Sequence, residues 1–82
     1  MPAWQTRWQT RSLTSEGISG RLYEVVVSWK PGDSGRFHWM VVHGSLSNGE
    51  VRASGSSRDL EKAKAEALEA ARRLDPDDRA FR

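Results

Sequence analysis

Two short segments in which every second residue is large and apolar constrain the fold of this chain more than any other feature. They cover residues 21–30 and 36–43, and residues 31–35 between them read Pro-Gly-Asp-Ser-Gly. A period of two is that of a strand with one buried face, and proline followed by glycine favours a tight turn. We therefore predict an antiparallel hairpin. Its buried face carries Tyr23, Val25, Val27 and Trp29 from the first strand, and Phe37, Trp39 and Val41 from the second.

Residues 58–74 predict an amphipathic helix that covers this buried face. Their apolar residues form one stripe at the helical period, and most of them are alanine, so the helix can lie close to a sheet that carries bulky side chains. Ser56 and Asp59 have the spacing of a capping box, although Ser57 is an alternative cap. The helix ends before Pro76, because the residue preceding proline avoids the α region. The stripe consists of Leu60, Ala63, Ala67, Ala70, Ala71 and Leu74.

The N-terminal segment, residues 1–15, contains a perfect repeat, because residues 4–11 read Trp-Gln-Thr-Arg twice. Threonine and tryptophan favour strands, so this segment is a candidate extra strand. Residues 15–20, with two glycines, are expected to form a loop. A regular strand over the repeat places Trp4, Thr6, Trp8 and Thr10 on one face and Gln5, Arg7, Gln9 and Arg11 on the other.

The remaining segments give shorter elements. Residues 44–49 end in Asn-Gly and predict a turn, after which residues 50–54 form a short third strand with Val51 and Ala53 facing inward. Residues 75–82 are expected to be a flexible tail. The acidic residues in that tail, which we expect to be solvated, are Asp75, Asp77 and Asp78.

Together these segments predict the α+β fold class: a three- or four-stranded antiparallel sheet packed on one C-terminal helix, in the order (β)βββα. The 82 residues form one domain, with a core over residues 21–74. No run of apolar residues approaches the ~20 that a membrane span needs, and no cysteine is present for disulfides or thiolate metal sites. We expect a cytoplasmic protein that does not bind a membrane.

The sequence offers little for catalysis. His38 and His43 are five residues apart, so a strand directs them to opposite faces and they cannot share a metal. Phosphate-loop, nucleophile-elbow and zinc-protease motifs are all absent from the sequence. We therefore expect a non-enzymatic protein without a metal or a small-molecule cofactor.

The outer face of the predicted sheet, which is the face opposite the helix, carries an apolar strip among its polar residues. A contiguous apolar patch on a surface usually has a partner. Either the segment from Trp4 to Trp8 folds over the strip, or a protein partner or second copy covers it, or the strip is exposed without a function. The strip consists of Leu22, Val26, Met40 and Val42.

Basic residues concentrate in the sheet half of the chain. Residues 1–58 carry seven basic and four acidic residues, although the net charge of the whole chain is only +2. Arginines on a sheet can bridge phosphates or contact guanine edges, and tryptophans among arginines can stack on bases. The alternative is ordinary surface charge and core tryptophans, and Glu24 and Glu50 on the outer face count against an anionic ligand. The candidate residues for nucleic-acid binding are Trp4, Arg7, Trp8, Arg11, Lys30, Arg36 and Arg52.

The stretch from Gly55 to Ala71 resembles the last strand and helix of double-stranded-RNA-binding domains. In that family a Gly-Ser turn leads into a basic, alanine-rich helix, and residues 63–67, Ala-Lys-Ala-Glu-Ala, match its Ala-Lys-x-x-Ala run. Arg58 and Asp59 stand where the family has paired lysines. The order of three strands and a helix is also similar to the arm-binding domains of tyrosine integrases and to plant-type three-stranded DNA-binding domains. Those families insert the sheet into the major groove, which here implies contacts from Lys30, Arg36 and Arg52.

Two functions therefore stay open. The leading interpretation is a nucleic-acid-binding module that uses the sheet face and the N-terminal Trp/Arg segment. The alternative is a protein-interaction module, such as a small inhibitor, an antitoxin-like protein, a phage-type regulator or a homodimer that pairs through the apolar strip. Nucleic-acid binding would show steep salt dependence, whereas a homodimer would show a doubled mass.

Overall fold

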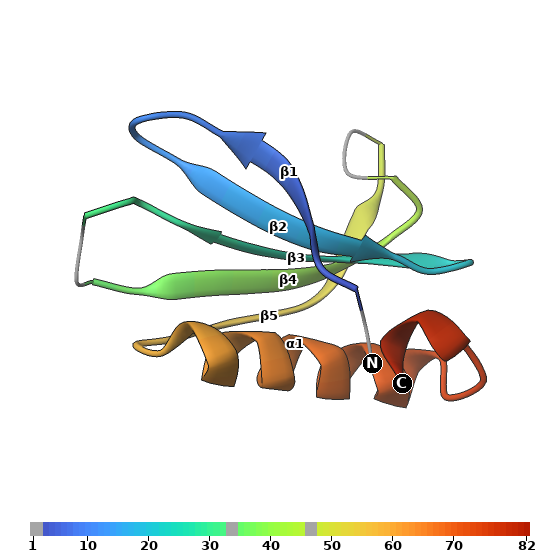
Figure 1. Ribbon diagram of the computed structural model, residues 1–82. Helices are drawn as coiled ribbons and strands as arrows, with labels where there is room; N and C mark the ends of the chain where they lie inside the picture. Colours follow the sequence, from blue (N-terminus) through green and yellow to red (C-terminus); the bar gives the residue numbers. More distant parts are fainter. Residues whose placement is uncertain (1–2, 33–34, 46–47) are drawn as a thin grey trace.

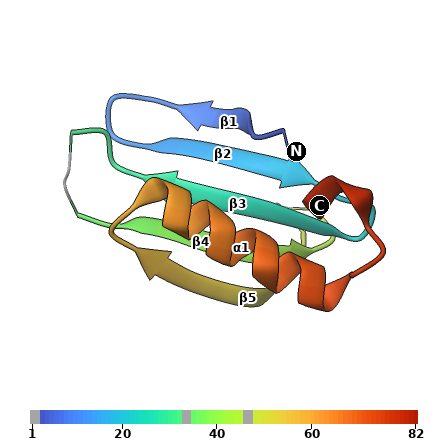
Figure 2. The ribbon, with the colours of Figure 1, turned by 60° about the horizontal axis from the view of Figure 1, so that its bottom comes forward.

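A computed structural model describes residues 3–32, 35–45 and 48–82 and has two layers, a five-stranded antiparallel sheet and one helix (Figure 1). The predicted α+β class is confirmed, with at least one strand more than expected. The strands follow each other in space in their chain order, and the helix lies across one face of the sheet (Figure 2). The elements are β1 (Gln5–Gln9), β2 (Thr14–Ser19), β3 (Tyr23–Trp29), β4 (Phe37–His43), β5 (Glu50–Ser57), α1 (Leu60–Leu74) and the short 3₁₀ helix η1 (Arg79–Phe81).

The predicted hairpin is the centre of the sheet. Val25 pairs with Val41 and Val27 with Trp39, and the three valines are fully buried against α1. Gly32 has a φ of 81°, a left-handed conformation that favours glycine at this position of the turn. Residues 33–34 and 46–47 of the two predicted turns, and residues 1–2, lie outside the described residues.

The prediction of a loop over residues 15–20 is wrong, because Thr14–Ser19 forms β2 between β1 and β3. Ile18 is 5% exposed and belongs to the core under the helix. The glycine that suggested a loop, Gly17, has a packing role: a Cβ there would lie 3.0 Å from Nε of Arg7 and 2.9 Å from a neighbouring carbonyl oxygen. A glycine inside a strand permits this close approach.

The predicted N-terminal strand is present as β1, but its faces differ from the regular alternation. Thr6 pairs with Glu16 and Trp8 with Ser15, so Arg7 is an extra residue in a β-bulge. Trp8 consequently lies on the outer face, whereas Trp4 packs against the core on the helix side. The two copies of the repeat thus place their tryptophans on opposite faces.

A second bulge changes the last strand, which extends to Ser57 rather than ending at residue 54. Ala53 pairs with Val41 and packs on the core as predicted, but Val51 pairs with Val42 and faces outward, leaving Arg52 as the extra residue. Glu50 pairs with His43, on the same side of the sheet as Tyr23, so the expectation of Glu50 on the outer face is wrong.

The helix begins one residue after Asp59, whose side chain accepts a hydrogen bond from the backbone N of Lys62 at 3.3 Å. Asp59 is therefore the cap, and Ser57 supports it by accepting from the Asp59 backbone N. The predicted alanine stripe is confirmed, and Leu68 joins it as a buried residue that the stripe did not include. Leu74, at the end of the stripe, stays 38% exposed.

The expectation of a flexible tail is wrong, because residues 75–82 fold back onto the turn between β2 and β3. Phe81 is completely buried, and Gly20 faces its ring so closely that a Cβ would overlap it. A large apolar side chain near a chain end gains enough from burial to hold the segment. We call this segment the C-terminal clasp.

Two of the three tail carboxylates are buried rather than solvated. Arg21 donates from Nε and Nη2 to the two oxygens of Asp75, at 2.9 and 2.7 Å. Asp78 accepts from the backbone N of Arg21 at 2.7 Å and of Ala80 at 2.9 Å. The Arg21 hydrogen bonds lower the pKa of Asp75 below its ordinary value of 3.8, and the Asp75 carboxylate raises the pKa of Arg21.

The helices that the described residues form are too short or too polar to cross a membrane.

Candidate nucleic-acid interface

The register of the sheet arranges the outer face into rows that cross the strands. Residues directly opposite each other in antiparallel strands share a face, so the pairings of all five strands can be followed from β1 to β5. The first row, which we call the polar row, consists of Trp8, Ser15, Ser28, His38 and Ser56. The next row consists of Gln5, Gly17, Val26, Met40 and Ser54.

The polar row carries hydroxyl and imidazole groups beside one large aromatic side chain, and of these residues Ser15 is nearly buried, at 8% exposed. The hydroxyls of Ser15 and Ser28 are hydrogen-bonded to each other, with 3.1 Å between their oxygens. His38 is exposed, and Trp8 at the β1 end is 59% exposed. Such groups can donate to phosphate or base edges, and an exposed indole can stack on a base.

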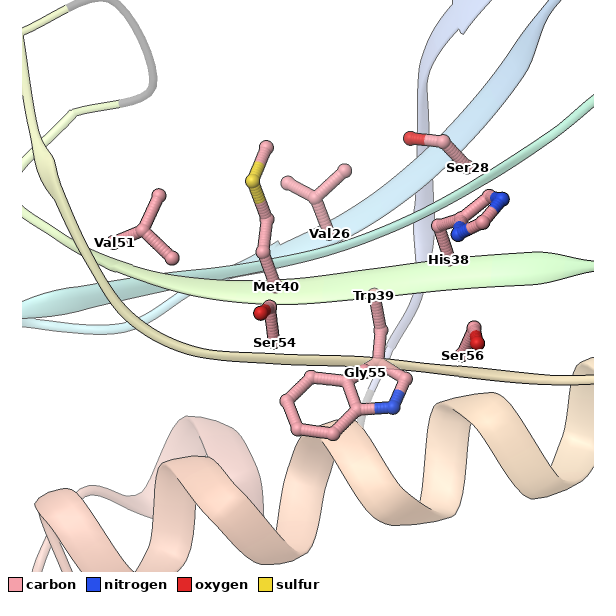
Figure 3. Close-up of a pocket in the computed structure, with 9 residues that line it drawn as sticks. All are labelled: Val26, Ser28, His38, Trp39, Met40, Val51, Ser54, Gly55 and Ser56. Carbon is pink, nitrogen blue, oxygen red and sulfur yellow. The ribbon is translucent and has the colours of Figure 1, made fainter.

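An open hollow of about 500 Å³ lies between the polar row and the next row, over β3, β4 and β5. We call it the central hollow. In Figure 3 the side chains of Val26, Met40 and Val51 point away from the helix, whereas Trp39 points toward it. The lining of the hollow is therefore apolar around Val26, Met40 and Val51 and polar around Ser28, His38 and Ser56. Its lining consists of Val26, Ser28, His38, Trp39, Met40, Val51, Ser54, Gly55 and Ser56.

Residues 10–13, 30–32, 35–36 and 57–60, which belong to three turns, lie at the same end of the molecule, on the left in Figures 1 and 2. Basic residues of these turns form what we call the cationic end. Arg36 donates to the hydroxyl of Ser56 at 3.2 Å, and no basic residue of the cationic end forms an ion pair with any residue that the structure describes. The cationic end consists of Arg11, Lys30, Arg36 and Arg58.

Lys30 and Arg36 connect the cationic end to the polar row. They line a second, smaller hollow together with Ser28 and His38 of that row. Both side chains belong to exposed residues. A ligand on the polar row would therefore meet both positive charges.

Two predicted candidates lie away from this surface. Arg52 sits on the β5 bulge and pairs with Glu50 at 3.6 Å. Trp4 is partly buried on the helix side, where Nζ of Lys64 lies 5.3 Å from the centre of its ring. Lys64 in turn pairs with Glu16 at 3.0 Å. This tryptophan is a core residue rather than a platform for bases.

Arg7 lies on the outer face beside Trp8, but its side chain is directed toward Ser19, at the end of β2 away from the cationic end. It donates to the hydroxyl of Ser19 at 2.8 Å, and that hydroxyl donates to Glu24 at 3.4 Å. Glu24 is thus hydrogen-bonded within the chain, and Glu50 lies on the helix side of the sheet. The two carboxylates that counted against an anionic ligand are therefore remote from the polar row.

The apolar strip offers less free surface than its sequence suggests. Val26 and Val42 are only 4% and 3% exposed, and Val42 is covered by Gly49 in the turn after β4. Leu22 is 49% exposed. Neither Trp4 nor Trp8 lines the central hollow beside Met40. The alternative in which the segment from Trp4 to Trp8 folds over the apolar strip is therefore not what the structure shows.

His38 and His43 point to opposite faces, as their spacing predicts, and His43 stacks at a tilt against Tyr23 with 5.1 Å between the ring centres. Among the residues that the structure describes, no three His, Asp or Glu side chains form a group that could hold a metal. The residues that sequence reasoning missed are Ser15, Ser56 and Val51. The face of Ser15 depends on the existence of β2, that of Val51 on the β5 bulge, and that of Ser56 on the extension of β5 to Ser57.

Comparison of the chain with protein-family models, with curated proteins and with solved structures gives no match.

Proposed function

We propose that this chain is a non-catalytic nucleic-acid-binding module that acts in the cytoplasm and binds its ligand on the polar row beside the cationic end. The observation that carries the proposal is the unequal distribution of charge pairing. The side chains of Arg11, Lys30 and Arg58 have no hydrogen bond or ion pair within the described residues, and they lie at the end of the sheet that also exposes Trp8. Unpaired cations beside an exposed aromatic ring suit phosphates and bases.

The small net charge of +2 does not oppose this proposal. Local charge steers a polyanion more than the total does when charges of one sign are gathered together. Each cation that neutralises a phosphate releases a counterion, so the binding constant falls with salt at a slope of about −0.7 to −0.9 per contact. For three or four contacts we expect a total slope of about −2 to −4.

The proposal is tested by fluorescence anisotropy with labelled DNA and RNA, as single strands and duplexes, at two salt concentrations. We expect salt-sensitive binding that Arg36→Glu weakens by about tenfold or more. Arg52→Glu is the matched control, since it makes the same charge change on the same sheet at a residue outside the polar row. Absence of binding to every oligonucleotide at low salt would contradict the proposal.

A homodimer through the apolar strip has weaker support, because Val26 and Val42 expose almost no area to a partner. Of the strip, Leu22 and Met40 remain for such an interface, and the row between them pairs the buried Val42 with Val51, which is 55% exposed. Light scattering, performed alongside the binding measurement, distinguishes the nucleic-acid-binding module from the homodimer. We expect a monomer mass, and a dimer mass combined with no nucleic-acid binding would favour the protein-interaction module.

A further inference from the structure

We infer that the nucleic acid is a single strand, with one unpaired base in the central hollow and another stacked on Trp8. This inference rests on the proposed function. It adds the form of the ligand and the position of two of its bases. Three observations support it: the central hollow has both apolar and polar lining residues, the sheet is five strands wide, and Trp8 lies in the polar row.

The central hollow matches the chemistry of one base. Met40 and Val51, with the 4% exposed Val26, give it an apolar part that suits the flat face of a base. The rest of its lining includes Ser28, His38 and Ser56, which can donate to and accept from the polar edge of a base. At about 500 Å³ it has the size of sites that take small ligands. In a duplex this edge is paired and the face is stacked, so only an unpaired base can enter without extra energy.

The width of the sheet argues in the same direction. Strands are ~4.8 Å apart, so the polar row spans ~19 Å from β1 to β5. The major groove of B-DNA is ~12 Å wide and admits a helix or a two-stranded ribbon. A five-stranded sheet cannot enter it broadside. The larger sheet therefore removes the basis for the analogy with three-stranded DNA-binding domains.

The polar row provides a path between the two bases. Trp8 on β1 and His38 on β4 are three strands apart, or ~14 Å. The hydrogen-bonded hydroxyls of Ser28 and of the nearly buried Ser15 lie between them. Lys30 and Arg36 lie along the same path, beside Ser28 and His38. A strand that follows the row therefore keeps its phosphates near the cations while its bases reach the hollow and the indole.

The experiment compares one labelled oligonucleotide as a single strand and as a duplex, for DNA and for RNA. We expect the single strand to bind about tenfold or more tightly than the duplex, and to quench tryptophan fluorescence. Trp8→Leu should weaken single-strand binding by about fivefold or more and remove most of the quenching, whereas Trp8→Phe should keep most of the affinity.

The central hollow is tested by Ser54→Leu, which fills it from an exposed position on β5. We expect a loss of about tenfold in single-strand affinity. Gln9→Leu is the control, because it adds the same side chain to the other edge strand on the opposite face. Circular dichroism checks that both variants fold. If Ser54→Leu does not fold, Val51→Thr replaces it and adds a hydroxyl to the apolar part of the hollow.

The outcomes separate the inference from the proposed function. Equal or tighter binding of the duplex would overturn the inference and leave the proposed function standing. Unchanged affinity in a folded hollow variant would also overturn it, as would unchanged quenching in Trp8→Leu. Binding of neither form would overturn both.

Discussion

The two ends of the sheet differ in what their charged residues do. At the end that holds the C-terminal clasp, Arg21 is bound by both oxygens of Asp75, and Asp78 caps the backbone beside it. At the cationic end, Lys30 and Arg58 have no acidic partner among the described residues. Charges that pair within the chain hold the fold, and charges that the fold leaves unpaired are available to a ligand. Changes at the first end should therefore alter stability, and changes at the second should alter binding.

The largest effect on stability is expected from the clasp. Phe81→Ala removes a completely buried ring and should lower the free energy of unfolding by about 3–5 kcal/mol. This is a large part of the roughly 4–12 kcal/mol expected for a domain of this size. Urea denaturation measures it, with Arg79→Ala as an exposed neighbour that should change stability by less than ~0.5 kcal/mol. A loss below about 1 kcal/mol would mean that the tail is not packed.

A smaller loss is expected where β2 meets the helix. Lys64→Met removes the partner of Glu16 and the positive charge above Trp4, and leaves a carboxylate whose side chain is only 23% exposed. We expect a cost of about 1–3 kcal/mol in urea denaturation. Lys62→Met, on the exposed side of the same helix, should cost less than ~0.5 kcal/mol. Equal effects in both variants would place Trp4 and Glu16 outside the core.

The Arg21–Asp75 pair should contribute less, because the Arg21 side chain is 58% exposed. The pKa of Asp75 is lower in the folded chain than its ordinary 3.8, so the unfolded chain binds the proton more readily. The stabilisation is therefore complete above about pH 4 and is lost as the pH falls through the lower, folded pKa. Thermal melts of the wild type and Asp75→Asn should differ most at neutral pH and converge in acid. A gap that widens in acid would refute this assignment.

The smallest effect on stability is expected at the exposed tryptophan. Trp8→Leu should change the free energy of unfolding by less than ~0.5 kcal/mol, because the side chain is 59% exposed at the edge of the sheet. Trp4→Leu should cost clearly more, since that ring packs against the core. Urea denaturation of the two variants compares the tryptophans of the two identical Trp-Gln-Thr-Arg copies, one exposed and one packed on the core. Equal losses would argue against the bulge at Arg7.

The sequence predicted the elements whose periodicity is unbroken. The hairpin of β3 and β4 and the stripe of α1 follow from apolar spacing alone, because one buried face requires it. The β2 strand was missed because Gly17 indicates a loop until Arg7 is known to lie across it. The bulge at Arg52 reversed the face of Val51, and no residue type marks such a bulge in advance.

The candidate site was predicted in part for the same reason. Lys30, Arg36 and Trp8 lie on the outer face near the cationic end, as the candidate site requires. Trp4 instead packs on the helix side, and Arg52 sits on the β5 bulge. The clasp was missed because short polar segments at a chain end are usually frayed. Here the segment is held in place because the Phe81 ring packs against Gly20, a contact that the linear sequence does not reveal.

The central claim, that the cationic end binds phosphates and the rest of the basic surface does not, is tested most directly by the salt dependence of binding. The slope of the binding constant against salt is measured for the wild type, for Lys30→Gln/Arg36→Gln, and for Arg52→Gln/Arg73→Gln. Both double variants lose two positive charges, but Arg52 and Arg73 are paired with Glu50 and Glu69. We expect the first slope to become shallower by about 1.4–1.8 and the second to match the wild type. Equal slopes for the two double variants would contradict the account.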